Sequence, residues 1–131
     1  MKVKVLAAVA SVGSLLAAAP VLAHHSFAAQ YDDTKPITLK GTVTKLEWMN
    51  PHARFYVDVK DDQGNVTNWE FELGAFNALI RAGWTRNSLQ PGDEVTVDGF
   101  LARDGSALVN ATSVAMSDGR KVFEGSPDQV P

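Results

Sequence analysis

Alternating apolar and polar residues between positions 37 and 116 limit what this chain can fold into more than any other feature of its sequence. A side-chain period of two is the pattern of a β-strand with one buried face. The runs are also rich in valine, isoleucine and threonine, which favour strands. We therefore expect strands at residues 37–48, 54–60, 67–73, 94–100 and 107–116, with a short sixth strand at 121–123.

The first run carries an irregularity. Ile37, Leu39 and Val43 alternate with polar residues, but Leu46 and Trp48 fall on the opposite face. One extra residue in a strand produces this change of phase. We therefore expect a β-bulge near residue 45.

The period changes between the third run and the fourth. Phe76, Leu79 and Ile80 have helical spacing within residues 75–82. Gly83 can end this short helix in the left-handed conformation, and Trp84 follows as a hydrophobic contact. Three strands, one helix and two strands is the order of the OB barrel. We expect an all-β fold with one short helix, a five- to six-stranded OB-like antiparallel barrel; another small barrel or a β-sandwich is the alternative.

The first 23 residues have the organisation of a secretory signal peptide. Lys2 and Lys4 precede an apolar run, and the small residues Val21 and Ala23 stand before the expected cleavage point. The apolar run is shorter than the ~20 residues that a membrane span needs. We expect export across the inner membrane to the periplasm, cleavage of this segment and no membrane contact afterwards. An uncleaved anchor is the alternative.

The expected domain organisation follows from this cleavage. The signal peptide covers residues 1–23, an N-terminal arm 24–36, the barrel domain 37–124 and a disordered polar tail 125–131. In the arm, Phe27 and Tyr31 lie on one face of one or two helical turns. The acidic and proline residues at 32–36 are expected to end those turns.

Composition excludes several classes of function. The chain has no cysteine, which rules out disulfides, thiolate metal sites and a cysteine nucleophile. It has 12 basic and 15 acidic residues; removing the segment with Lys2 and Lys4 leaves 10 against 15, or a net charge of −5. Nucleic-acid binders depend on lysine and arginine against phosphates. We therefore expect no nucleic-acid partner.

Five motifs together resemble a family of small secreted bacterial proteins that is classed as a domain of unknown function. They are Ala-His-His-Ser-Phe at 23–27, Glu-Trp-Met-Asn-Pro-His at 47–52, Asn-Trp-Glu-Phe-Glu-Leu-Gly at 68–74, Gly-Trp-Thr-Arg at 83–86 and Pro-Gly-Asp-Glu-Val-Thr-Val at 91–97. The resemblance covers nearly all of the chain after the signal peptide. It implies an exported, OB-like protein and names no activity.

Three histidines, His24, His25 and His52, are candidate metal ligands. Cleavage after Ala23 would give His24 a free α-amine beside its imidazole, and these two nitrogens can chelate one ion. Nitrogen ligands without a thiolate favour Cu(II) by the divalent affinity order. This end resembles the N-terminal histidine chelates of exported copper proteins, although their other motifs are absent. The alternative is an exposed terminus with His52 in a turn.

Whether the arm reaches His52 depends on the path of the first strand. If that strand runs away from the arm, the arm must retrace about ten strand residues, or ~33 Å. The thirteen residues of the arm span up to ~45 Å when extended, and ~35 Å with a helical turn. Contact between His24 and His52 is therefore within range but not required.

A second candidate site surrounds the turn at Asn50-Pro51-His52. OB domains often bind ligands with the loop between strands one and two, and with the loop between strands four and five, here near residues 102–106. We expect a ligand-binding surface made of Trp48, Asn50, His52, Arg54 and Tyr56. It would suit a sugar, a peptide or an anion. In the alternative interpretation Trp48 and Tyr56 are structural, as Trp69 and Trp84 are expected to be.

Catalysis has little support in the sequence. No serine lies in a nucleophile-elbow pattern, and no phosphate-binding glycine loop occurs. Glu70 and Glu72 lie on one face of a strand, and we expect them on the solvated side of the sheet. The sequence thus predicts an exported, non-catalytic binding or accessory protein. A copper(II) protein using His24 and an enzyme built on that metal are the alternatives.

Overall fold

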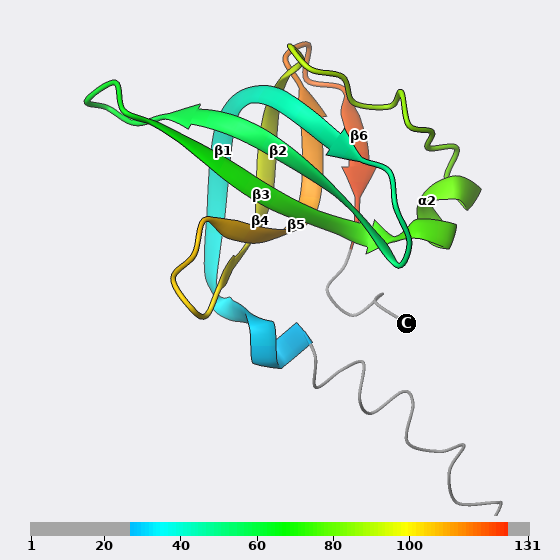
Figure 1. The fold of residues 1–131 in the computed structure, drawn as a ribbon, viewed down its shortest axis with the longest axis horizontal. Coiled ribbons are helices and arrows are strands. Elements are labelled where there is room, and N and C mark those ends of the chain that lie inside the picture. Colours follow the sequence, from blue (N-terminus) through cyan, green and yellow to red (C-terminus); the bar gives the residue numbers. More distant parts are fainter. Residues whose placement is uncertain (1–26, 126–131) are drawn as a thin grey trace, which may run out of the picture.

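The computed structural model describes residues 27–125, and strands make up most of this part of the chain (Figure 1). Residues 27–30 are helical and lead directly into the first strand. The elements that follow are β1 (Tyr31–Glu47), β2 (His52–Lys60), β3 (Val66–Ala75), α2 (Phe76–Arg81), β4 (Glu94–Ala102), β5 (Leu108–Met116) and β6 (Lys121–Glu124). This is the expected succession of three strands, one helix and two strands, with a short strand added.

The sheet closes on itself. Its order is β3-β2-β1-β4-β5-β6, and β3 also pairs with β5. The β3–β5 pair is parallel and joins Glu70, Phe71 and Glu72 to residues 108–110, whereas the other pairs are antiparallel. The prediction of an OB-like barrel is therefore confirmed, with one parallel pair as the closing seam.

The long strand β1 makes closure possible because it serves two neighbours. Its first part pairs with β4 as far as Thr42, and its last part pairs with β2 from Thr42 onward. The strand curves around the barrel between these partners (Figure 1). The register against β2 shifts between Val43 and Lys45, which confirms the predicted bulge.

The start of β1 differs from expectation. The sequence placed the arm at 24–36 and the strand from Ile37, but β1 begins at Tyr31. The pairing with β4 shifts between Tyr31 and Pro36. The residues at 32–36, which were expected to end the helical turns of the arm, therefore occupy an irregular stretch within the strand. Proline is tolerated at such a position because it need not donate to the ladder there.

The barrel interior is filled by alternate residues of the strands. β2 shows the pattern clearly, because Ala53, Phe55 and Val57 are fully buried while the residues between them face outward. The rings of Phe55 and Phe71 stack at 5.0 Å in the centre. Other buried members are Val43, Leu73, Leu79, Trp84, Leu89, Val95, Val97, Val109, Ala111 and Val114.

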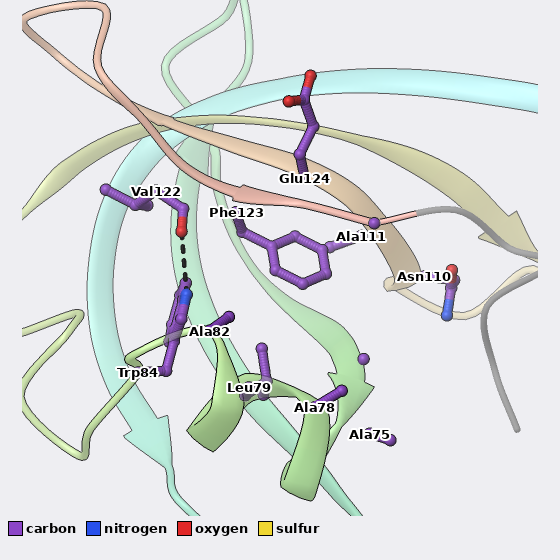
Figure 2. A pocket seen from close by; sticks show the side chains of 12 residues that line it. Ala75, Ala78, Leu79, Ala82, Trp84, Asn110, Ala111, Val122, Phe123 and Glu124 are labelled. Carbon is purple, nitrogen blue, oxygen red and sulfur yellow. Dashed lines mark hydrogen bonds between the residues drawn. The ribbon is translucent and has the colours of Figure 1, made fainter.

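The end of α2 follows the sequence prediction. Gly83 has a positive φ of 87°, and its N–H donates to the carbonyl of Ile80, while the N–H of Trp84 donates to that of Leu79. This pair of bonds is the Schellman arrangement that closes a helix with glycine. The buried Trp84 ring then donates its Nε1–H to the Val122 carbonyl at 3.0 Å, which ties α2 to β6 (Figure 2).

Two strand glycines lie where another strand passes closely, and Gly99 provides a test of the barrel. A Cβ at Gly99 would lie 2.2 Å from the Asn110 carbonyl oxygen. We expect Gly99→Ala to lower the free energy of unfolding by about 2–3 kcal/mol, because β4 and β5 would have to separate. Urea denaturation measures this loss. Gly74→Ala is the control, since a Cβ there would meet only the Phe123 ring at 3.8 Å; equal losses in both variants would contradict the packing of β4 on β5.

Candidate functional site

The alternation of β2 sets three of the predicted ligand-binding residues on one face. His52, Arg54 and Tyr56 point outward between the buried residues of this strand, and all three are half-buried. Their side chains therefore lie in a row on the outside of the barrel. This arrangement agrees with the grouping expected from the sequence for these three residues.

The neighbouring strand β3 brings two glutamates to that row. The register pairs Arg54 with Glu72 and Tyr56 with Glu70. Arg54 Nη1 donates to Glu70 Oε1 at 2.6 Å. This ion pair is only partly exposed, with 39% and 27% of the two side chains accessible. It therefore fixes the guanidinium against β3 while part of each group still faces solvent.

Glu72 is the most buried carboxylate of this face. Its carboxylate accepts hydrogen bonds from the Tyr31 hydroxyl and from His52 Nδ1, the latter at 2.5 Å. Burial raises the pKa of Glu72, but the hydrogen bonds from His52 and Tyr31 and the positive charges of His52 and Arg54 outweigh burial, so the net pKa lies below its usual range. Glu72 is therefore an ionised, fully engaged acceptor at neutral pH.

This carboxylate determines the chemistry of its two partners. An ionised carboxylate can only accept, so Nδ1 of His52 carries a proton and donates it. A neutral His52 then presents the lone pair of Nε2, and its side chain is 27% exposed. For Tyr31, burial, the bond to Glu72 and the charge of that carboxylate together raise the pKa far above its usual range. Tyr31 stays protonated.

The bulge in β1 adds the remaining members of the face. It places Lys45 opposite Tyr56 and Glu47 opposite Arg54. Glu47 accepts from Lys45 Nζ at 2.7 Å and from the Tyr56 hydroxyl at 3.3 Å. Burial and the charges of Glu70 and Glu47 raise the pKa of Tyr56. An anionic Tyr56 is thus disfavoured here.

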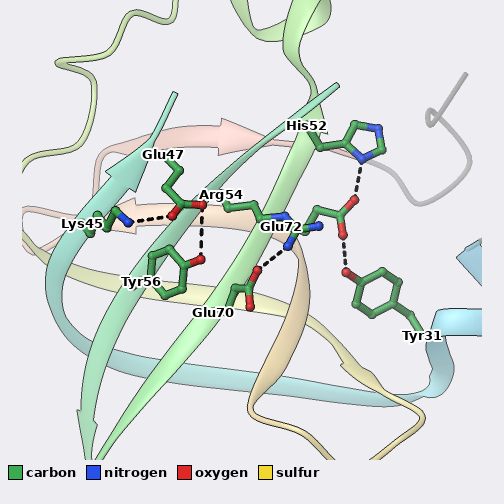
Figure 3. A network of polar contacts seen from close by, with 8 residues as sticks. All are labelled: Tyr31, Lys45, Glu47, His52, Arg54, Tyr56, Glu70 and Glu72. Atoms are coloured by element: carbon green, nitrogen blue, oxygen red, sulfur yellow. Dashed lines mark hydrogen bonds and ion pairs between the residues drawn. The ribbon is translucent and has the colours of Figure 1, made fainter. Parts of the chain in front are cut away.

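These side chains form one continuous polar surface on β1, β2 and β3, which Figure 3 shows in full. We call it the polar face and define it as Tyr31, Lys45, Glu47, His52, Arg54, Tyr56, Glu70 and Glu72. Three carboxylates oppose two permanent cations, so the polar face is slightly acidic when His52 is neutral. Within residues 27–125, no cluster of three or more histidine, aspartate or glutamate side chains is arranged to hold a metal ion.

Two predicted ligand-binding residues lie apart from the polar face. Trp48 is half-buried against the core, and its ring packs on Phe76 with centroids 4.7 Å apart. Asn50 is exposed in the turn that precedes β2. The loop between β4 and β5 contacts the helical residues at 27–30 instead, because Arg103 donates through Nε to the Ala28 carbonyl at 2.6 Å.

The expectation that Glu70 and Glu72 form a solvated side of the sheet is wrong for Glu72, which is buried. Sequence analysis placed Glu72 correctly on the face opposite Phe71 but did not predict that this side chain is buried. The start of β1 and the seam between β3 and β5 enclose it there. Tyr31 was missed for the same reason; its helical spacing from Phe27 was the only signal, and their rings lie 5.5 Å apart.

The arm does not have to retrace a strand to approach His52. Tyr31, at the start of β1, and His52, at the start of β2, bond to the same Glu72 carboxylate. The expected detour of ~33 Å is therefore wrong, because β1 curves over the barrel (Figure 1) and the Glu72 carboxylate joins the start of β1 to the start of β2. His24 and His25 lie outside the described residues, as do the signal peptide 1–23 and residues 126–131.

Comparison with known proteins gives a family. A model described as a family of unknown function (DUF6152) matches residues 11–111. The chain belongs to this family. A search of curated proteins finds no match for this DUF6152 chain. In the described part of the chain, no helix has the length and apolarity to cross a membrane.

Several solved structures are similar to this family member. A complex of TiaS with a transfer RNA and ATP aligns at 20% identity and a TM-score of 0.48, over 65% of this chain and 18% of that one. The N-terminal domain of PriB from Thermoanaerobacter tencongensis aligns at 18% and 0.46, over 64% and 97%. The second single-stranded DNA binding protein of Mycobacterium smegmatis aligns at 20% and 0.46, over 70% and 97%. At these identities and scores the likenesses carry no argument about what this chain binds.

The role of Glu72 can be tested by Glu72→Gln. The amide cannot accept from Tyr31 and His52 as the carboxylate does, so we expect the free energy of unfolding near neutral pH to fall by about 1–3 kcal/mol. The lowered folded pKa of Glu72 also means that the unfolded chain protonates first as pH falls. Glu72 thus contributes stability above the ordinary carboxyl range that is lost as pH drops through the folded pKa.

Urea denaturation of the parent protein and the variant between neutral and acidic pH measures both effects. The acid-dependent loss should be smaller in Glu72→Gln. Glu124→Gln is the control, because the Glu124 side chain is exposed and bonds only to Lys121 among the described residues. If the free energy of unfolding changed with pH in the same way in the parent protein and in Glu72→Gln, Glu72 would not be the ionised acceptor described above.

Proposed function

We propose that this protein is an exported, non-catalytic binding protein whose polar face contacts a small, uncharged, hydroxyl-rich ligand such as an oligosaccharide. The observation that carries the proposal is the ordered network of half-exposed donors and acceptors on β1, β2 and β3. Arg54, Tyr56 and Glu70 are each held by a partner and still accessible. Groups positioned in this way bind a ligand with little further loss of conformational entropy.

The charge of the polar face favours an uncharged ligand. Its carboxylates outnumber its permanent cations, and each cation already has a glutamate partner. An anion would have to displace those partners, and a nucleic acid would meet too few free cations to release counterions. Hydroxyl groups can accept from Arg54 and donate to glutamate oxygens at the same time. In OB domains the face over strands two and three binds oligonucleotides or oligosaccharides, and the acidic balance of the polar face favours the second class.

The histidine–carboxylate pair supports a binding role over a catalytic one. Glu72 orients His52 as in a hydrolytic triad, but no hydrogen bond joins Nε2 to a serine, threonine or other nucleophile among residues 27–125. Export to the periplasm rests on the basic start, apolar run and small residues of positions 1–23. The ligand would then be a saccharide present outside the inner membrane.

Arg54→Gln tests the binding proposal. We follow backbone NMR signals of the exported form while adding chitotriose, maltotriose or an uncharged tripeptide. A saccharide should shift signals of the polar face, and Arg54→Gln should weaken that binding about tenfold through loss of a charge-assisted bond. Arg120→Gln is the matched control, since Arg120 is exposed in the turn before β6.

Two results would overturn the proposal. In one, both saccharides leave the polar face unshifted at millimolar concentration. In the other, only the tripeptide binds there, which would replace the saccharide by a peptide as ligand class.

A second function, binding of copper(II), is favoured by a different observation. Glu72 joins Tyr31 to His52, so the segment that precedes β1 ends beside a histidine whose Nε2 makes no hydrogen bond among the described residues. Phe27 is in contact with Tyr31, and three extended residues beyond Phe27 span ~10 Å. His24, with its new α-amine, and His25 would therefore lie within reach of His52. A carboxylate behind a ligating histidine is also the usual second partner at metal sites.

Calorimetric titration with Cu(II) tests this second function. The protein that begins at His24 should bind at least about tenfold more tightly than one with an alanine added before His24, because the added residue removes the amine–imidazole chelate. His52→Ala should weaken binding by about tenfold or more. Asn50→Ala serves as the control, since Asn50 is exposed two residues away.

Equal affinities for the two N-termini would exclude the chelate. An unchanged affinity in His52→Ala would exclude His52 from the site. An enzyme built on this metal would need both results to be positive and, in addition, an open coordination position.

A further inference from the structure

A second concave site lies between α2 and the end of the barrel. It is a cavity of about 250 Å³ that α2, the end of β3, β5 and β6 enclose (Figure 2). Most of its wall is apolar and comes from small side chains of α2 and β3, together with two aromatic rings. The residues that matter here are Ala75, Ala78, Ala82, Trp84, Asn110 and Phe123.

The two rings are fixed, which keeps the cavity open. Trp84 Nε1 donates to the Val122 carbonyl at 3.0 Å, and Trp84 packs edge-on against Phe123 at 6.1 Å. A Cβ on Gly125 would come within 2.7 Å of the Phe123 ring, so that ring is held against the backbone. Ala78 of α2 and the flanking Ala75 and Ala82 lie opposite, and their side chains are too short to fill the space. The cavity therefore stays unfilled because the rings on one side are held in place and the side chains on the other are short.

Asn110 supplies a polar group in this apolar wall. The residue is only 7% exposed, its side-chain amide makes no hydrogen bond to any described residue, and the amide atoms stay accessible where Asn110 lines the cavity. An amide that is covered without gaining a partner loses its bonds to water without replacement, so a ligand that covers Asn110 has to offer it a hydrogen bond. An accessible donor and acceptor in a mostly apolar cavity wall is a group that can orient a bound ligand.

We propose that this cavity binds a small aromatic molecule that carries one uncharged amide group. An apolar cavity of ~150 Å³ holds one benzene ring, so about 250 Å³ accommodates a ring with a short substituent. The ring would lie between Ala78 of α2 and the rings of Trp84 and Phe123. The ligand amide would pair with Asn110, since each amide offers both a donor and an acceptor.

The charge of the chain favours this uncharged group over a carboxylate. Glu124 lines the same cavity, and no permanent cation among the described residues does. Residues 126–131, Ser-Pro-Asp-Gln-Val-Pro, follow directly after Gly125 at the cavity wall. They are a poor occupant, because Val130 is their one aliphatic residue apart from the prolines and it follows Asp128 and Gln129.

This site is independent of the polar face. The two share no residue, and Arg54 does not line the cavity. Binding here would therefore persist if the saccharide proposal failed, and the reverse also holds.

NMR titration of the exported form with benzamide, toluene and benzoate tests the proposal. Benzamide should shift the side-chain amide of Asn110 and the indole signal of Trp84, and bind more tightly than benzoate. Asn110→Ala should weaken benzamide binding about 3- to 10-fold, the effect of one lost hydrogen bond, and leave toluene binding within about twofold. Continued binding of toluene also shows that this variant is folded.

Two variants of α2 locate the binding. Ala78→Leu fills the cavity from an exposed helix position and should abolish binding of both benzamide and toluene. Asn77→Leu places the same side chain on the neighbouring residue, which does not line the cavity, and should leave both affinities unchanged. Arg54→Gln should also bind benzamide normally.

Three results would overturn the inference. One is the absence of shifts at Asn110 and Trp84 with benzamide. Another is an equal loss of benzamide and toluene binding in Asn110→Ala. The third is undiminished binding in Ala78→Leu.

Discussion

One buried carboxylate connects the parts of this barrel that carry its candidate function. Glu72 lies on β3 beside the parallel seam with β5, and it accepts from the first residue of β1 and the first residue of β2. An ionised group in this position is tolerated only because its bonds offset the cost of leaving water. The same bonds set the tautomer of His52 and keep Tyr31 protonated. Closure of the barrel and organisation of the polar face are thus one arrangement.

The elements of the fold were predictable from sequence because their signals are local. Alternation around Phe55 and Val57 shows which side of β2 is buried, the change of phase before Leu46 shows the bulge, and Gly83 shows where α2 ends. The start of β1 was not predictable in this way. Residues 32–36 have the composition of a break, and only their irregular pairing with β4 allows the strand to pass through them.

The candidate site was predictable only in part, for a related reason. Arg54, His52 and Tyr56 share a face because a strand has a period of two, which needs no tertiary information. The cover over Glu72 depends on the curvature of β1 and on a parallel pairing between segments that the sequence gives no reason to join. The distance between the N-terminal arm and His52 was not predictable for the same reason. A straight first strand and a curved one place the arm at opposite ends of the barrel.

Two buried polar residues at the β3–β5 seam differ in whether the folded chain supplies them with hydrogen-bond partners. Glu72 and Asn110 are direct register partners on β3 and β5, and each is 7% exposed. The carboxylate of Glu72 has partners from two other strands, so its removal would expose unmet donors and cost stability. The amide of Asn110 has no such partner among the described residues, and its atoms stay accessible from the cavity. An accessible amide in an otherwise apolar wall is the group with which the proposed aromatic amide would pair.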